Sequence, residues 1–198
     1  VVHAEPPVRE WSFVAIATTM NPVEDRSMFL EESIGVLKRT PGALDALLRG
    51  LPDEWVRGTD GPDTWSPYDV IGHLSHGERT DWMPRLKIIL EYGSERPFDP
   101  FDRVAQFNDG EPKTLAARLD EFASLRAANI ELLSNLGIAE EHLELQGTHP
   151  AFGRVTMRQL LAAWTAHDLA HVVQIGRTMA RRYRDEVGPW AEYLSVMR

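Results

Sequence analysis

The chain has 198 residues, the length of one large domain, and 43% of them are hydrophobic, which is enough for a sizeable core. Its 21 basic and 30 acidic residues give a formal net charge of −9, which disfavours binding to the phosphate backbone of nucleic acids. There is no cysteine, which excludes disulfides, thiolate metal ligands and a cysteine nucleophile. A chain without cysteine fits a reducing, cytoplasmic environment.

The N-terminal stretch contains one short apolar run, Phe13 to Ala17, which is too short for a membrane span or for the core of a signal peptide. Neither an internal repeat nor a low-complexity tract divides the rest of the chain. We therefore expect residues 1–20 to be a flexible extension, residues 21–198 to form one domain, and the chain to have no membrane segment.

Two long amphipathic helices are expected in the first half of the chain. The first covers residues 24–48, and Thr40 followed by Pro41 predicts a kink, because threonine caps a helix and proline suits a first turn. The second covers residues 66–93, where a serine N-cap and a proline open the helix. Pro84 predicts a kink in this second helix.

Two more helices are expected in the second half. Residues 113–136 form the third, which ends before Gly137. Residues 143–155 are typical of two short strands around a turn or of a long ordered loop. Thr156 opens the fourth helix with a capping box, and this helix extends to about Tyr183. The sequence predicts an all-α four-helix bundle with a kinked helix and a short hairpin or loop before the last long helix.

The fourth helix carries a pair of histidines that can bind one metal ion. His167 and His171 are four residues apart, so their side chains are separated by about 400° around the helix axis and lie on nearly the same face. His171 falls inside the apolar stripe of this helix and His167 at its edge. Either the two imidazoles bind an ion, or they form hydrogen bonds within the core.

A third ligand is expected from the second helix, because metal sites in enzymes commonly use three protein ligands and leave a position open. His73 lies on the flank of the apolar stripe, whereas His76 is about 60° further toward solvent. We therefore favour His73 as the third ligand and place His76 at the rim. His142 and His149 lie in polar sequence and are expected at the surface.

Two carboxylates are candidate catalytic groups. Asp168 projects into the apolar stripe of the fourth helix, so it either meets a partner such as an arginine or a tryptophan N–H, or it supports the site or acts as a base. Glu78 is close to the histidines in sequence and is a candidate for proton transfer, with a solvated role as the alternative. His167-Asp168-x-x-His171 also resembles a metalloprotease motif with Glu192 as a downstream ligand, but that class usually has this helix beneath a sheet, and the present sequence offers hardly any strand. Three tryptophans are candidates either to line a pocket or to pack in the core: Trp65, Trp82 and Trp164.

Two motifs, Trp-Ser-Pro-Tyr-Asp-Val-Ile-Gly-His-Leu at residues 65–74 and His-Asp-Leu-Ala-His-Val-Val-Gln-Ile at residues 167–175, resemble the DinB/YfiT-like superfamily of bacterial four-helix proteins. Residues 181–194 are similar to the tail of DinB-like domain proteins. The resemblance extends from about residue 24 to the end of the chain. It implies a bundle of the DinB/YfiT type that binds one divalent ion, such as zinc, nickel or iron, through His73, His167 and His171.

The resemblance also implies an activity. Members with known activity include thiol-dependent S-transferases and a mycothiol-dependent isomerase, and many others are regarded as metal-dependent hydrolases. We therefore expect an enzyme that uses its metal site to activate a low-molecular-weight thiol, which must arrive as a cosubstrate because the chain has no cysteine. The alternatives are a metal-dependent hydrolase, a non-catalytic metal-dependent binding protein, and a structural bundle in which the metal only holds the helices together. The expected partners are a small-molecule substrate and a second copy of the chain in a homodimer.

Overall fold

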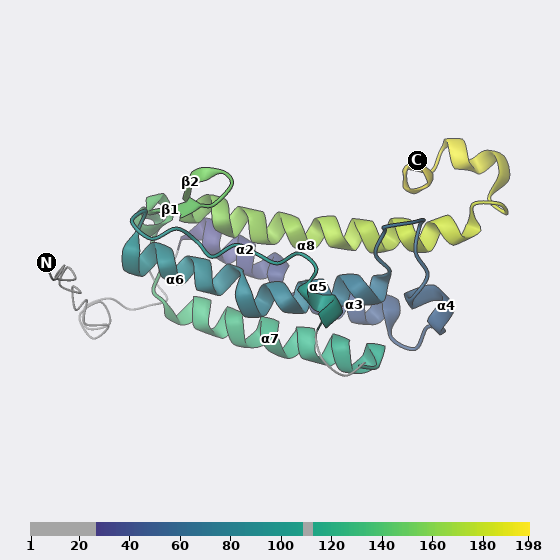
Figure 1. Ribbon diagram of the computed structural model, residues 1–198, viewed down its shortest axis with the longest axis horizontal. Coiled ribbons are helices and arrows are strands. Elements are labelled where there is room, and N and C mark those ends of the chain that lie inside the picture. The colour runs from purple at the N-terminus through teal and green to yellow at the C-terminus, as the bar shows by residue number, and fades with distance from the viewer. Residues whose placement is uncertain (1–26, 109–112) are drawn as a thin grey trace, which may run out of the picture.

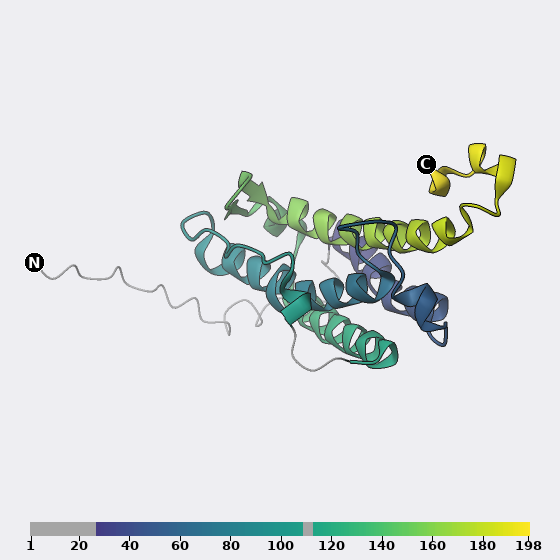
Figure 2. The same cartoon turned by 45° about the vertical axis from the view of Figure 1, so that its right-hand side comes forward.

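The computed structural model describes residues 27–108 and 113–198. The segment expected to be a flexible extension, residues 1–20, lies outside the described residues. The described residues form four helical rods along the long axis of the molecule, two of them broken into consecutive helices (Figures 1 and 2). The rods are α2 (Met28–Leu37) with α3 (Thr40–Leu48), α5 (Pro67–Thr80) with α6 (Trp82–Tyr92), α7 (Leu115–Asn135) and α8 (Met157–Ala180). This arrangement confirms the predicted all-α four-helix bundle.

The break in the first rod lies where the sequence predicts it. The hydroxyl of Ser27 caps α2 by accepting a hydrogen bond from the backbone N–H of Leu30. The helix ends at Leu37, and α3 restarts at Thr40 with Pro41 in its first turn. Proline is tolerated there because the first N–H groups of a helix have no partner within the helix. The predicted kink at this position is confirmed.

The break in the second rod lies earlier than predicted. A reciprocal pair of hydrogen bonds between Ser66 and Asp69 forms the capping box that starts α5. The rod is interrupted at Asp81, where the backbone has φ −112° and ψ −73°, three residues ahead of the predicted kink at Pro84. A continuous helix would need a hydrogen bond from residue 84 to the carbonyl of Thr80, and proline has no N–H to donate. Restarting the helix at residue 82 puts the proline in a first turn, where no such bond is required.

A β-hairpin precedes the last rod. Strands β1 (Gln146–His149) and β2 (Gly153–Thr156) pair antiparallel. Of the two alternatives for this region, the hairpin is therefore correct. The capping box between Thr156 and Gln159 then starts α8, as predicted.

Short helices connect the rods and follow α8: α4 (Asp53–Val56), η1 (Ala105–Asn108), η2 (Glu140–Glu144), η3 (Arg181–Tyr183), η4 (Gly188–Glu192) and η5 (Ser195–Met197). Both views place the hairpin and the segment after α8 on the same side of that helix, one near each end (Figures 1 and 2). None of the helices in the described parts of the chain combines the length and the hydropathy needed to span a membrane.

The apolar core consists of two clusters. One contains Trp82 and Trp164 and joins α2 and α6 to α8, and the other contains Leu44 and Phe122 and joins α3 to α5 and α7. The guanidinium of Arg126 lies between them, 5.0 Å from the ring centre of Phe122 and 5.3 Å from that of Trp164. A charged group therefore separates the two apolar halves of the bundle.

We expect Leu44→Ala to lower the free energy of unfolding by about 2–5 kcal/mol, because Leu44 is fully buried and its truncation leaves a cavity. Leu47, on the same helix, is 41% exposed and serves as a matched control. Leu47→Ala should cost about 0.5 kcal/mol or less. Urea unfolding of both variants measures the difference, and equal losses would contradict the position of this core.

Candidate metal centre

Three histidines from two rods meet inside the bundle. His73 comes from α5, and His167 and His171 come from consecutive turns of α8. The Nε2 atom of His167 lies 3.2 Å from Nε2 of His73 and 3.0 Å from Nε2 of His171. One ligand nitrogen from each of the three rings lies within 4.8 Å of the other two. The structure therefore brings together the three residues predicted as ligands.

Two of the three separations between these nitrogens match those expected around a single metal ion, and the third pair lies within 4.8 Å. With zinc–nitrogen bonds of about 2.0–2.1 Å, two imidazole ligands of a tetrahedral ion are roughly 3.3 Å apart, and two ligands at a right angle are roughly 2.9 Å apart. The observed separations of 3.0 and 3.2 Å fall between these values. Three imidazoles are a donor set that suits zinc, nickel or iron and leaves further coordination positions for other ligands.

Burial keeps the histidines in the neutral form that metal binding requires. Desolvation, followed by the charges of neighbouring groups including His171, lowers the pKa of His73 to about 4 and that of His167 to about 3. Desolvation also lowers the pKa of His171, against the opposing effects of a hydrogen bond that its ring donates to Gln174 and the charge of Asp168. Lone pairs are therefore available for a cation at neutral pH.

Aromatic side chains orient two of the rings. The ring of His73 lies 4.8 Å from Trp65 and 5.5 Å from Phe101, and the ring of His167 lies 5.1 Å from Trp82. Within the described parts of the chain, the buried Nδ1 atoms of His73 and His167 have no hydrogen-bond partner. Packing against aromatic rings fixes the orientation of His167, and in His73 an interaction with the backbone of Arg103 adds to this packing.

A hydrogen bond orients the third ring. The side-chain oxygen of Gln174 lies 2.8 Å from Nδ1 of His171. An Nδ1–H that donates to this oxygen leaves the lone pair on Nε2, which is the atom facing His167. Sequence analysis missed Gln174, although its position three residues after His171 places it on the same face of the helix.

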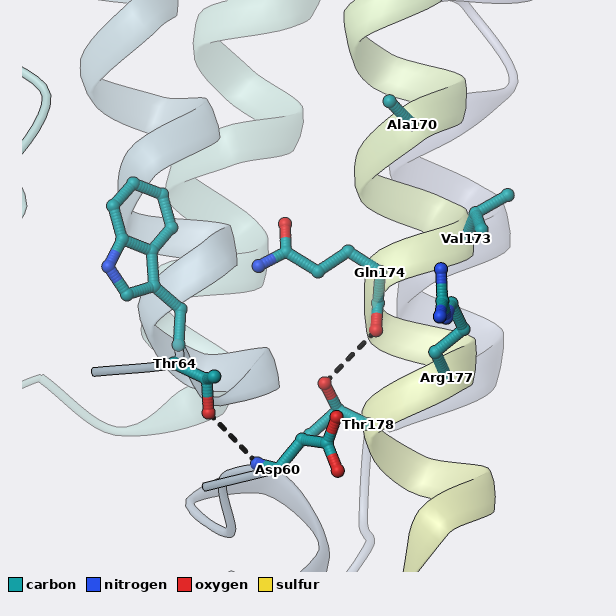
Figure 3. A pocket seen from close by; sticks show the side chains of 8 residues that line it. Asp60, Thr64, Ala170, Val173, Gln174, Arg177 and Thr178 are labelled. Atoms are coloured by element: carbon teal, nitrogen blue, oxygen red, sulfur yellow. Dashed lines mark hydrogen bonds between the residues drawn. The ribbon is translucent and has the colours of Figure 1, made fainter. Parts of the chain in front are cut away.

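A cavity of about 260 Å³ lies between the loop that precedes α5 and the face of α8 (Figure 3). Gln174 extends from α8 toward the loop, and Arg177 follows one turn later (Figure 3). Trp65 lines the cavity and is nearly parallel to the ring of His171, with an interplanar angle of 10° and a centroid distance of 6.5 Å. The cavity is therefore separated from the candidate ligands by one layer of side chains. Its lining consists of Asp60, Thr64, Trp65, Ala170, Val173, Gln174, Arg177 and Thr178.

The two candidate catalytic carboxylates contact an arginine. Asp168 accepts hydrogen bonds from both terminal nitrogens of Arg126, at 2.6 and 3.0 Å, and Glu78 accepts one at 2.7 Å. An arginine partner was one of the two alternatives for Asp168. Glu78 is only 2% exposed, so the solvated role considered for it is wrong. Their catalytic roles stay predictions.

The other histidines considered do not join the cluster. His76 packs on Phe101, with 5.1 Å between the ring centres, and its Nε2 lies 3.2 Å from the hydroxyl of Thr80. His142 and His149 each accept a backbone hydrogen bond in their own loops, on η2 and at the hairpin. These positions agree with the preference for His73 as the third ligand.

Sequence analysis also missed Arg126. This residue occupies a core position of α7, in a stripe with Leu119, Phe122, Ile130 and Leu133. The spacing of these residues follows the helical period, so a lone arginine within the stripe was the available signal. A buried guanidinium needs carboxylate partners, and the sequence had already singled out Asp168 and Glu78 as unusual carboxylates.

We expect the chelated protein to lose stability as the pH falls from 7 to 5. The unfolded chain takes up protons near the ordinary histidine pKa of about 6.5, whereas folded His73 and His167 stay neutral until about pH 4 and 3. Acid therefore favours the unfolded state in this range. Urea unfolding with chelator at several pH values measures the slope, which should be smaller in His167→Gln. Equal slopes for the two proteins would contradict the neutral, buried state of this residue.

Known protein families and solved structures include relatives of this chain. A family model described as the DinB superfamily matches residues 37–175. Among solved structures, the chain is similar to YfiT from Bacillus subtilis, described as a probable metal-dependent hydrolase with an unusual four-helix bundle topology. The two share 19% sequence identity with a TM-score of 0.67, and the match covers 83% of this chain and 94% of that one. No curated protein matches the chain significantly.

At this level of identity, the likeness to YfiT shows a shared fold. The family match establishes membership of a family, because it extends from the end of α2 into α8. It includes all three histidines of the candidate centre. The chain therefore belongs to the DinB superfamily.

Proposed function

We propose that this chain is an enzyme that binds one divalent metal ion through His73, His167 and His171 and activates a low-molecular-weight thiol for transfer. The observation that carries this proposal is the convergence of three Nε2 atoms, two of whose rings contact Trp65 and Gln174 on the wall of a cavity. A zinc, nickel or iron ion bound there would supply the positive charge that lowers the pKa of a bound thiol or water.

The surroundings of the histidines favour a thiol over water as the nucleophile. The carboxylates of Glu78 and Asp168 accept hydrogen bonds from Arg126, so neither is free to take a proton from water as the glutamate of a metalloprotease does. A thiol, with an ordinary pKa of about 8.5, needs a much smaller pKa change than water at about 15.7. Activation of a thiol therefore does not require a general base among the protein's own residues.

The cavity supports binding of an elongated cosubstrate. Trp65 lines the cavity and packs against the ring of His73, so it offers an apolar surface beside the sulfur end of the cosubstrate. Arg177 lies on the cavity wall with its guanidinium bonded to the backbone oxygen of Arg198, and it offers a positive charge to a carboxylate. We assign this cavity to the polar end of the thiol.

The proposed reaction is a nucleophilic transfer. The thiol releases its proton to solvent, its sulfur forms a bond to an electrophilic carbon, and the bond from that carbon to the leaving group breaks. The leaving group departs with the bonding electron pair and takes up a proton from solvent. Lowering the thiol pKa to neutrality gains only about tenfold in thiolate at pH 7. Most of the rate must come from holding the electrophile in line with the sulfur, which is the role of the aromatic and cavity residues.

Hydrolysis is the second candidate. YfiT, which shares the fold, is described as a probable metal-dependent hydrolase. Three neutral imidazoles would also allow a bound water to ionise near neutral pH. A binding protein without turnover would have the same three histidine ligands. Absence of both thiol conjugation and ester or amide cleavage would favour this alternative.

We also propose that the chain is cytoplasmic and forms a homodimer. The absence of cysteine supports the first proposal. For the second, Leu169 and Val173 lie one turn apart on α8 and are 50% and 57% exposed, which supports an apolar contact between two copies.

We expect purified protein to contain one equivalent of divalent metal per chain. His171→Ala should remove it, because two imidazoles hold such an ion far more weakly than three. His149→Ala is the matched control, since this histidine lies on the hairpin outside the cluster. Elemental analysis of the three proteins checks the assignment, and equal metal content in both variants would refute it.

We expect metal-loaded protein to conjugate a reactive electrophile to one member of a panel of low-molecular-weight thiols. Chelated protein and His171→Ala should both be inactive, because each lacks the metal that lowers the thiol pKa. Mass spectrometry of the conjugate measures the reaction. Cleavage of an ester or amide without any thiol would instead support the hydrolase.

A further inference from the structure

A buried ionic cluster joins all four rods next to the histidines. Arg126, on α7, is 1% exposed and donates to Glu78 of α5 at 2.7 Å and to Asp168 of α8 at 2.6 and 3.0 Å. Its Nη1 also donates to the backbone oxygen of Leu37, at the end of α2, at 2.8 Å. The side chains of Glu78 and Asp168 are both fully buried.

Further donors complete the cluster. The indole of Trp164 donates to Glu78 at 3.0 Å, and the amide of Asn129 donates to the same carboxylate at 3.0 Å and to the backbone oxygen of Glu78 at 2.8 Å. Every one of these bonds has a carboxylate or carbonyl oxygen as the acceptor, which is the pattern of ionised carboxylates. Each carboxylate is held in one orientation by at least two bonds.

The two carboxylates lie on the helices that carry the histidines. Asp168 directly follows His167 and precedes His171 by three residues. Glu78 follows His73 by five residues on α5, a rise of about 7.5 Å along a rigid helix. Fixing these two carboxylates on one guanidinium therefore fixes α5 against α8, and with them the relative position of the three imidazoles.

Contacts between the histidines do not explain this alignment in the metal-bound form. At 3.0 and 3.2 Å between Nε2 atoms, a metal-free imidazole can donate a hydrogen bond to its neighbour, but a bound cation takes all three Nε2 lone pairs and excludes these bonds. Other contacts between α5 and α8 must then hold the ligands together. Arg126 bridges these two helices through charge-assisted hydrogen bonds, which are both strong and directional.

We propose that Arg126 is a positioning residue of the metal centre, which aligns His73 with His167 and His171 by bonding Glu78 and Asp168 at the same time. This inference rests on the proposed metal site and assigns Glu78 and Asp168 a role through the histidines, without contact with the substrate. It predicts that the geometry and the affinity of the metal centre change when the bridge is altered, even where the bundle stays folded.

The test uses the full chain, stripped of metal and titrated with Co²⁺. Its absorption spectrum reports coordination geometry, and competition with a chromophoric chelator gives the affinity. Arg126→Lys keeps the charge but loses the fork that bonds both carboxylates. The triple variant Glu78→Gln, Arg126→Met, Asp168→Asn removes all three charges together, a change that leaves no uncompensated buried charge and that folded proteins often tolerate.

The matched control is Arg85→Met. Arg85 pairs with Asp81 at 2.6 Å, and the two side chains are only 10% and 8% exposed. This pair joins neighbouring turns of one rod and does not connect α5 to α8. Its loss should lower stability while leaving the Co²⁺ spectrum and affinity unchanged.

We expect affinity for Co²⁺ to fall at least about tenfold in the triple variant, by a smaller factor in Arg126→Lys, and the spectrum to change in both. Circular dichroism checks that each variant remains helical. Wild-type affinity and spectrum in a folded triple variant would overturn the proposal, and so would loss of helicity in both variants, since Arg126 would then be a folding residue. If the wild-type chain itself does not bind Co²⁺, the proposed metal site fails first.

Discussion

The hydrogen bonds of a single guanidinium, that of Arg126, reach the other three rods of the bundle. A buried charge of this kind costs several kcal/mol unless every partner is in place. Each rod must therefore present its acceptor at one level along the bundle: the carbonyl of Leu37, the carboxylate of Glu78 and that of Asp168. Apolar contacts alone tolerate small slides of one helix along another, whereas these bonds allow one register.

The same burial explains the chemistry of the candidate centre. Desolvation keeps His73 and His167 neutral, so their nitrogens are available to a cation. It also requires the neighbouring carboxylates to be paired, and Arg126 pairs both. A buried site that left Asp168 unpaired next to His167 would favour protonation of the histidine and compete with metal. The ionic cluster and the metal centre are thus two consequences of removing water from one part of the bundle.

Local features of the chain predicted most of the helix boundaries. The capping boxes at Ser66 and Thr156 and the break before Pro41 depend on bonds between residues at most four positions apart, so they can be read from short stretches of sequence. The interruption at Asp81 was not predicted, because a proline can be accommodated either by bending a helix or by restarting it. Packing of α6 against the rest of the bundle decides between the two.

The sequence by itself determined the four rods and placed His167 and His171 on one face, since a spacing of four residues fixes their relation within a single helix. The helical wheel and the family resemblance together identified His73. Only the tertiary structure decided that Asp168 and Glu78 bond to Arg126, which lies 42 and 48 residues away from them along the chain. Helical periodicity gives the direction of each side chain but not the neighbour it meets. That neighbour depends on how three separate helices are rotated and shifted against one another.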